Sequence, residues 1–185
     1  MAHEARLFLR QLLTQPKQVS AIAPSSRWLA RAMVQGLGPH TGRVVEFGPG
    51  TGRLTEGILA AGVAQKDLTL FEMSADFVTH LHLRFPDVKI HHDVAQSASQ
   101  LVKPGVGAVI SGLPLLSMPT ALRESIVQSA FDILAPDGVF VQFTYGQKPP
   151  LSAEQTARMG LTVTQGPKVW ANLPPARVFR FHRAT

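Results

Sequence analysis

Spacing of apolar residues by three and four positions indicates two helices near the beginning of the chain. Over residues 4–14 an apolar stripe lies opposite a side that carries arginines, which is typical of an amphipathic helix. The stripe consists of Ala5, Phe8, Leu9, Leu12 and Leu13. Pro16 ends this helix. A second helix is predicted to begin at residues 24–26, where serine can cap the first turn, and to end at Gly36 or Gly38.

Beyond residue 42 the pattern changes to short apolar runs that alternate with helical segments. The runs predicted as strands are residues 43–47, 68–71, 88–91, 106–110 and 139–143. The predicted helices are residues 51–61, 74–85 and 119–134, and Asp137-Gly138 is a predicted turn. Strands separated by helices form βαβ units, so we expect a parallel sheet with helices on both faces.

The last part of the chain departs from this alternation. Residues 161–163, 169–170 and 177–182 have extended patterns with no helix between them. Consecutive strands without a crossover helix indicate antiparallel pairing, so we predict a hairpin at one edge of the sheet. Its connection is the segment Asn172-Leu173-Pro174-Pro175.

The composition fits one globular α/β domain. The chain has 185 residues, of which 45% are hydrophobic and 16% are charged, and this length suffices for one core. No apolar run reaches the ~18–20 residues of a membrane span, and charges interrupt the first residues where a signal peptide needs an apolar centre. Cysteine is absent, which excludes disulfides, thiolate catalysis and cysteine metal sites. We therefore expect a cytoplasmic protein.

The charge adds a preference for anionic partners. The formal net charge is +6 and the pI is about 10.3. Such a protein attracts nucleic acid, acidic lipid or phosphate-bearing substrates. An ordinary surplus of surface Lys and Arg has the same composition, so charge alone does not choose among these partners.

Three glycines follow the first predicted strand, in the stretch EFGPGTG from Glu46 to Gly52. Glycines at a strand-to-helix crossover let the backbone turn tightly and let a ligand contact main-chain atoms. No Gly-Lys-Ser/Thr follows, which excludes a P-loop, and the spacing differs from the dinucleotide fingerprint G-x-G-x-x-G. Glu46 would repel a pyrophosphate. It suits a cation, such as the amino group and sulfonium of S-adenosylmethionine.

Two more acids follow the next predicted strands. Glu72 lies at the end of the second, where a carboxylate can accept hydrogen bonds from ribose hydroxyls. Asp93 follows the third, where it can accept from an adenine amino group. A glycine-rich turn or an acid after a strand is common by itself. Because the ends of neighbouring parallel strands meet, the three features together predict one ligand crevice.

This set resembles the class I S-adenosylmethionine-dependent methyltransferases over most of the chain. The resemblance implies a seven-stranded, mostly parallel, Rossmann-like sheet with an antiparallel C-terminal hairpin. The implied cofactor contacts are Glu46, Gly48, Pro49, Gly50, Thr51, Gly52, Glu72, Met73, Asp93, Val94, Ser111, Gly112 and Leu113. By this resemblance Glu46, Gly48 and Gly50 hold the methionine end and Glu72 the ribose. Asp93, Met73 and Val94 hold the adenine.

The segment after the fourth predicted strand carries the acceptor chemistry in this class. Enzymes that methylate amino groups of nucleic acids have N-L-P-Y or D-P-P-Y here, in which the acid or amide accepts from the amine and the aromatic residue stacks on the base. This chain reads SGLPLL over residues 111–116. Gly112 replaces the amide and Leu115 the aromatic residue, so the predicted acceptor site is apolar.

Longer segments carry a closer resemblance to the bacterial phospholipid N-methyltransferases, which methylate phosphatidylethanolamine toward phosphatidylcholine. They are residues 8–33, VVEFGPGTG, SGLPLLSMP and LAPDGVFVQFTYG, and together they lie within residues 8–146. The implied substrate contacts are Leu113, Pro114, Leu115, Leu116, Tyr145 and Phe8. The front half also resembles the ribosomal RNA adenine dimethyltransferases. An RNA amino-methyltransferase and a non-catalytic cofactor-binding partner protein are therefore the alternatives.

The expected catalytic residues are Tyr145 and Ser111. A neutral amine attacks the methyl group, and an aromatic face such as that of Tyr145 can hold the quaternary ammonium product by cation–π attraction. Ser111 can orient the amine. Both residues could instead serve packing and backbone hydrogen bonding. His91 and His92 point to opposite sides of a strand, so we expect no metal.

The amphipathic segment at the start of the chain has an apolar and a basic face, the pattern of an interfacial helix. We therefore expect residues 1–38 to form a cap that docks on anionic membrane, and residues 39–185 to form the methyltransferase domain. The expected location is the inner face of the cytoplasmic membrane, with a phospholipid as substrate and no nucleic acid. The oligomeric state stays open.

Overall fold

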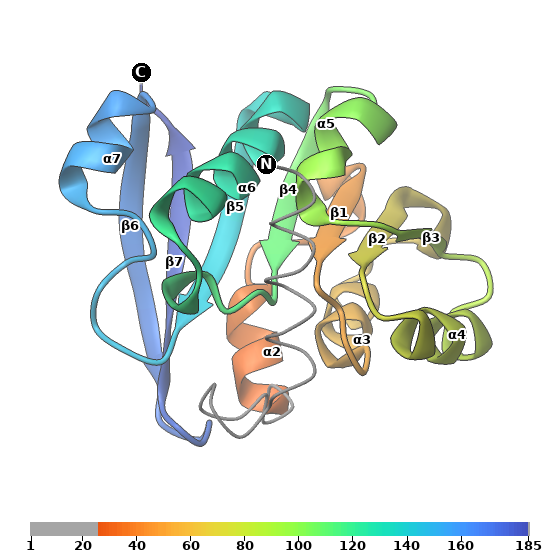
Figure 1. Ribbon diagram of the computed structural model, residues 1–185. Coiled ribbons are helices and arrows are strands. Elements are labelled where there is room, and N and C mark those ends of the chain that lie inside the picture. The colour runs from red at the N-terminus through yellow and green to blue at the C-terminus, as the bar shows by residue number, and fades with distance from the viewer. Residues whose placement is uncertain (1–25, 185) are drawn as a thin grey trace.

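The protein is a single α/β unit around a seven-stranded sheet (Figure 1). A computed structural model describes residues 26–184. The strands are β1 (Val44–Phe47), β2 (Leu68–Glu72), β3 (Lys89–His92), β4 (Val106–Ser111), β5 (Leu134–Thr144), β6 (Leu161–Val169) and β7 (Ala176–Arg183). The α-helices are α2 (Arg27–Met33), α3 (Arg53–Ala60), α4 (Ala75–Arg84), α5 (Ala98–Leu101), α6 (Thr120–Ile133) and α7 (Ala153–Arg158). No helix in residues 26–184 is long and apolar enough to span a membrane.

The strand order is β3-β2-β1-β4-β5-β7-β6, with parallel pairing from β3 to β5 and antiparallel pairing of β7 with both β5 and β6. This arrangement confirms the expected fold, including the C-terminal hairpin. Both α5 and α7 are short helices that the apolar pattern did not predict. The helix predicted over residues 4–14, which includes Phe8, lies outside the described residues.

The predicted turn at Asp137-Gly138 is instead an irregularity inside β5. Val106 pairs with Leu134 while Ala108 pairs with Val139, so β5 carries extra residues opposite β4. A Cβ atom on Gly138 would lie only 3.0 Å from the Val106 carbonyl oxygen. Glycine therefore permits the bulge, and the strand continues through it.

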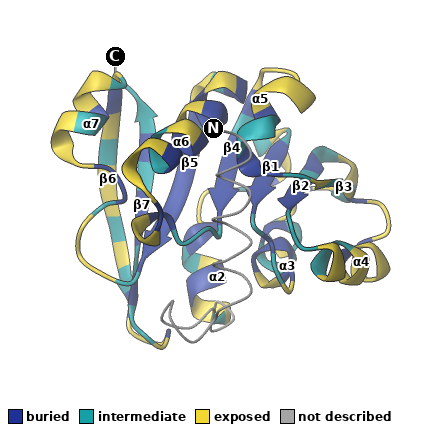
Figure 2. Cartoon of the chain, viewed as in Figure 1, coloured by how far each residue is buried: buried dark blue, intermediate teal, exposed yellow. Residues whose placement is uncertain are grey.

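Helices cover both faces of the sheet with separate apolar layers. One layer joins α5 and α6 to Val45, Phe47, Val109 and Phe140, and the other joins α2, α3 and α4 to neighbours of opposite parity, such as Val44 and Ile110. Figure 2 shows the central strands buried, while the outer sides of α4 and α7 are exposed. Because both faces of the central strands are buried, their sequences are continuous apolar runs instead of alternating apolar and polar residues.

Helix α2 belongs to the folded core. The Ser26 hydroxyl accepts a hydrogen bond from the Leu29 amide (3.2 Å), as predicted for the N-cap. Leu29 and Met33 are fully buried in the layer that contains Ile58 of α3. Arg180 of β7 donates to the Ala32 carbonyl oxygen (3.1 Å) near the helix end, and its burial lowers its pKa.

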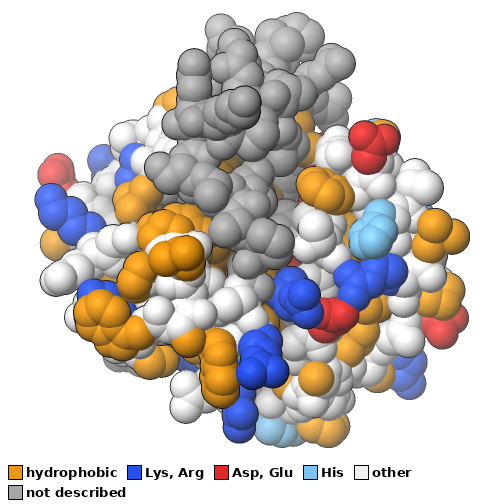
Figure 3. All heavy atoms as spheres, turned by 90° about the horizontal axis from the view of Figure 1, so that it is seen from below, with side chains coloured by type: hydrophobic (Ala, Val, Ile, Leu, Met, Phe, Trp, Pro, Cys, Tyr) orange, Lys and Arg blue, Asp and Glu red, His pale blue; other side chains and the backbone are white. Residues whose placement is uncertain are grey.

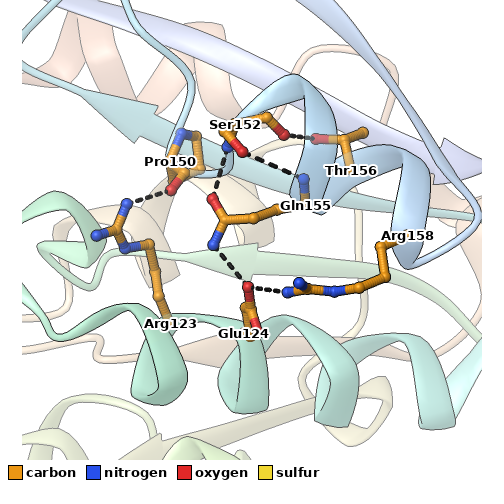
Figure 4. Close-up of polar contacts among 7 residues, drawn as sticks. All are labelled: Arg123, Glu124, Pro150, Ser152, Gln155, Thr156 and Arg158. Atoms are coloured by element: carbon orange, nitrogen blue, oxygen red, sulfur yellow. Dashed lines mark hydrogen bonds and ion pairs between the residues drawn. The ribbon is translucent and has the colours of Figure 1, made fainter.

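Polar contacts fasten the segment after β5 to α6 (Figure 4). The Arg123 guanidinium donates to the Pro150 carbonyl oxygen (2.7 Å) and to that of Met118 (3.3 Å). One side chain thus links the segments that leave β4 and β5. Gln155, in a capping box with Ser152, donates to Glu124 (2.6 Å) and so docks α7 on the same helix.

Shortening Met33 to Ala should destabilise the protein by ~2–5 kcal/mol, because it opens a cavity in a layer to which α2 contributes directly. Chemical denaturation followed by far-UV circular dichroism measures this change. Leu83→Ala, at a position 82% exposed, is the matched control and should change the unfolding free energy by less than ~0.5 kcal/mol. Equal effects of the two variants would contradict the placement of α2 in the core.

Candidate active site

The predicted site residues gather at the edge where the parallel strands end. Phe47 pairs with both Phe71 and Ser111, and Glu72 pairs with His92. The loops after β1, β2, β3 and β4 therefore leave the sheet beside one another, as Figure 1 shows at the lower side of the sheet. Parallel α/β folds place ligands at this edge.

The loop after β1 and the loop after β4 touch through their backbones. The Gly112 amide donates to the Phe47 carbonyl oxygen (2.8 Å), and a Cβ atom on Gly112 would lie 2.7 Å from the Gly48 carbonyl oxygen. On the other side, a Cβ atom on Gly48 would lie 2.6 Å from the Leu113 side chain. The backbone therefore leaves no room for a side chain at Gly112, whereas Gly48 is favoured by its φ of +67°.

Gly50, unlike Gly48 and Gly112, has open space where a side chain would lie. Its φ of +54° suits glycine, but a Cβ atom there would meet nothing within 4 Å. Its amide donates to Glu72 Oε2 (3.0 Å), and the other oxygen of Glu72 accepts from the Ser74 amide (2.8 Å). The nearly buried carboxylate therefore holds the loop in place. A carboxylate oxygen can accept more than one hydrogen bond, so Glu72 retains capacity for ribose hydroxyls.

Glu46 is fully buried at the base of the same loop. Its Oε2 accepts from the Thr55 hydroxyl of α3 (2.7 Å), whereas Oε1 has no hydrogen-bond partner among the described residues. The pKa of Glu46 is raised to about 8, chiefly by burial and to a smaller extent by the nearby Glu72 carboxylate, although the Thr55 hydrogen bond lowers it. A buried carboxyl with an unused oxygen is suited to a cationic ligand, which would favour its ionised form.

The residues assigned to adenine come together after β2 and β3. Asp93 Oδ1 accepts from the Val94 amide (2.7 Å), and Val94 and Met73 both pack against the layer beneath α6. His92 Nε2 lies 2.9 Å from the Met73 carbonyl oxygen. This contact ties the ends of β2 and β3 to each other.

The neighbouring His91 points elsewhere. Its ring stacks on Phe71 with centroids 4.8 Å apart, and burial lowers its pKa. His91 and His92 therefore do not converge. Within residues 26–184 no group of three or more His, Asp or Glu side chains could hold a metal ion.

On the side predicted to receive the acceptor, Ser111 lies beside Gln142 of β5, its register partner. Both side chains are fully buried. The Gln142 amide nitrogen donates to the carbonyl oxygens of Leu113 (2.9 Å) and Phe143 (2.8 Å), which leaves Oε1 without a partner in the described structure. The Ser111 hydroxyl accepts from the Leu113 amide (3.4 Å).

Gln142 is a buried polar residue at this edge that the sequence analysis missed. The available signal was one long polar side chain inside the apolar run VFVQFTY. Its bond to Leu113 holds the start of the segment after β4, whereas its bond to Phe143 stays within β5. Its free oxygen is a second buried acceptor, on the opposite face of the sheet from Glu46.

The leucines after Pro114 separate. Leu115 is buried in the layer beneath α6, whereas Leu116 is 44% exposed. Leu115 therefore packs in the core and does not line a surface that a substrate can reach. The contact between Leu113 and Gly48 keeps the start of this segment against the glycine loop.

Tyr145 lies just beyond β5, three residues past Gln142. Its ring packs edge-on against Phe143 with centroids 5.3 Å apart, and burial raises its pKa. It is therefore a neutral phenol near neutral pH, which suits a ring face or a hydrogen bond but not a base. Its assigned role at the acceptor stays a prediction.

Comparison with known proteins supplies one sequence relative and many structural ones. No profile of an established family matches the chain. Ornithine lipid N-methyltransferase from Singulisphaera acidiphila is 33% identical over 147 residues, which cover 75% of this chain and 76% of the relative. This identity and coverage place the two chains in one family.

Two solved structures illustrate the fold. The glycopeptide N-methyltransferase MtfA, determined with S-adenosylmethionine, aligns with a TM-score of 0.66 over 88% of this chain and 96% of its own at 15% identity. A TehB-like methyltransferase from Corynebacterium glutamicum aligns with a TM-score of 0.63 over 98% of both chains at 14% identity. At these identities the likeness concerns the fold.

The Glu46→Gln variant should gain stability and lose ligand affinity. The folded ligand-free protein keeps the Glu46 proton up to a pH of about 8, whereas the unfolded chain loses it near 4.5. Between these values the unfolded chain binds fewer protons, so wild-type stability falls as pH rises. The variant lacks this loss and should be more stable by roughly 2–4 kcal/mol at pH 8.

Although Glu46→Gln should be more stable, it should bind S-adenosylmethionine more weakly, which calorimetric titration measures. Loss of the charged partner should weaken binding about 10- to 100-fold. Wild-type binding below pH 8 should also release a proton, visible as a dependence of the heat on the buffer. Unchanged affinity and no proton release would contradict the assignment of Glu46 to a cationic ligand.

A methyl group at Gly50 should block the ligand with little effect on the fold. Gly50→Ala meets no protein atom, so it should cost only the ~1–2 kcal/mol of an L-residue at positive φ, while affinity for S-adenosylmethionine falls at least about tenfold by exclusion. Gly160→Ala is the matched control, since Gly160 has a φ of +64° and equally open surroundings. Parallel titrations that show equal losses for both variants would argue against ligand contact at Gly50.

Proposed function

The chain belongs to the family of lipid N-methyltransferases that includes the ornithine lipid enzyme of Singulisphaera acidiphila, and we propose that it methylates the amine of phosphatidylethanolamine toward phosphatidylcholine. The observation that carries the proposal is the 33% identity over 147 residues to an enzyme that acts on a lipid amine. The finer assignment to ethanolamine follows the resemblance of the segments around residues 111–119 and 134–146.

S-Adenosylmethionine is the methyl donor and supplies a methyl group activated by its sulfonium charge. The residues of the site fit it. The unused Oε1 of Glu46 can accept from its amino group, and the open side of Gly50 leaves room for it against the backbone. Glu72 and Asp93, at the ends of β2 and β3, would hold the ribose and the adenine.

The acceptor side favours a lipid amine over a nucleobase. Base-methylating relatives use an amide and an aromatic side chain, and this chain has Gly112 and Leu115 in those places. Leu115 is buried in the core, so no stacking surface replaces the missing aromatic residue at that position. The remaining exposed leucine, Leu116, is compatible with an acyl or glycerol moiety.

Protein groups at the acceptor edge orient an amine without taking its proton. The free Oε1 of Gln142 and the Ser111 hydroxyl are neutral acceptors that can align an N–H bond. Tyr145 stays protonated because burial raises its pKa. The amine therefore loses its proton to water before it reacts, and burial of the site strengthens the hydrogen bonds that orient it.

Ornithine lipid is the second candidate acceptor, and the family relative favours it specifically. Its headgroup presents a primary amine and an anionic group, as phosphatidylethanolamine does. The chemistry described for Gln142 and Ser111 serves either amine. The two lipids differ in whether phosphate or carboxylate accompanies the amine.

The decisive assay supplies methyl-labelled S-adenosylmethionine with three separate acceptors: phosphatidylethanolamine vesicles, ornithine lipid vesicles and ribosomal RNA. We expect label in the chloroform-soluble products of the first. Label confined to ornithine lipid would transfer the proposal to the second candidate.

Label in RNA alone would overturn the lipid assignment, and no label in any acceptor would favour a non-catalytic partner protein. Gly50→Ala serves as the control with weakened cofactor binding and reduced labelling, and Gly160→Ala as the active control. The pair distinguishes enzymatic transfer from non-enzymatic labelling.

A further inference from the structure

The connection between β6 and β7 lies at the same edge of the sheet as the active site. Because β7 is antiparallel to β5, the first residues of β7 lie beside the last residues of β5, with Arg177 opposite Thr144. Asn172 in this connection accepts a hydrogen bond from the Ser26 amide through Oδ1 (2.9 Å) and donates to the Pro174 carbonyl oxygen (2.7 Å). The connection and the first turn of α2 are thus fastened to each other.

Three large apolar side chains of this unit face solvent. Leu173 is 84% exposed, Trp170 is 71% exposed and Trp28 is 48% exposed. Trp28 and Trp170 are the two tryptophans of the whole chain. A folded protein normally buries such side chains at least in part, so their shared position at one edge requires an explanation.

Cations accompany both tryptophans. The Lys168 ammonium lies 3.6 Å from the Trp170 ring centroid, and the Arg27 guanidinium lies 5.1 Å from that of Trp28. No Asp or Glu occurs in residues 26–45 or 155–184, which include α2 and the hairpin. Figure 3, which faces this edge, shows Lys and Arg side chains among hydrophobic ones. We call Trp28, Trp170, Leu173, Arg27 and Lys168 the tryptophan patch.

We propose that the tryptophan patch rests on an anionic bilayer and holds the active-site edge against the lipid headgroups. Tryptophan prefers the headgroup level of a bilayer, where its ring is partly desolvated and its N–H stays hydrated. Leu173 can enter the acyl boundary, while Lys168 and Arg27 attract acidic lipid. This role is separate from that of residues 1–25.

The position of the patch matches the lipid reaction, and in this respect the inference rests on the proposed function. A phospholipid whose chains remain in the bilayer presents its amine only at the headgroup level. The edge that holds Ser111 and Gln142 must therefore face the membrane. The tryptophan patch lies at that edge, on the far side of β7 from the end of β5, and would set this orientation.

Tryptophan fluorescence tests the contact directly, because both tryptophans of the chain belong to the patch. With vesicles of phosphatidylglycerol and phosphatidylcholine, emission should shift to shorter wavelength, and brominated acyl chains should quench it. Pure phosphatidylcholine and high salt should weaken both signals. Unmoved, unquenched emission in the presence of acidic vesicles would overturn the proposal.

The variant Trp170→Ser with Leu173→Ser keeps Trp28 as the reporter and should weaken vesicle binding about tenfold. Leu83→Ser, an equally exposed leucine on α4, should change it less than about twofold. If the patch variant binds vesicles normally and instead shifts a monomer–dimer equilibrium in size-exclusion chromatography, the patch is a protein interface and the proposal is wrong.

Activity measurements separate this proposal from the proposed function. The patch variant should methylate vesicle lipid about tenfold more slowly and a dispersed short-chain phosphatidylethanolamine at the wild-type rate. Equal loss on both substrates would contradict a docking role. If wild-type protein methylates neither lipid, the proposed function fails, while the fluorescence result still decides whether the patch binds membrane.

Discussion

The active site depends on the backbone contact between the loop after β1 and the loop after β4. The Gly112 amide bonds to the Phe47 carbonyl oxygen, and Gly112 lies so close to the Gly48 carbonyl oxygen that it has no room for a side chain. The loop predicted to hold the methyl donor and the segment predicted to receive the acceptor are therefore directly joined. Arg123 and Gln142 extend this unit by tying the segments after β4 and β5 to α6 and to the sheet.

Among the residues that the structure describes, Glu46 and Gln142 each keep a buried side-chain oxygen that no protein group satisfies. Glu46 Oε1 lies on the side of the sheet that faces α3, and Gln142 Oε1 lies on the side that faces α6. Buried acceptors without partners cost free energy, so their presence at the ligand edge fits groups that ligands complete. Burial also explains the raised pKa of Glu46, because a buried carboxylate is unfavourable when no cation lies beside it.

Much of the fold could be predicted from the sequence because its elements are locally specified. Buried parallel strands read as apolar runs, Ser26 supplies a cap, and the missing crossover helix reveals the hairpin. The bulge at Gly138 and the short helices α5 and α7 could not be predicted in this way. They depend on the close approach of Val106 and on contacts such as that between Gln155 and Glu124, which are distant in sequence.

The sequence was sufficient to predict a methyl-donor site, because the spacing of the glycines and acids shows that they follow successive strands. The tertiary structure alone decided how the residues predicted for the acceptor are arranged. It paired Ser111 with Gln142, turned Leu115 into the core and joined Ser26, the N-cap of α2, to Asn172, 146 residues away. Local spacing encodes which strand end a residue occupies. Which other residues lie beside that residue depends on the face of the strand it occupies and on the strand register. It also depends on the antiparallel pairing of β7 with β5.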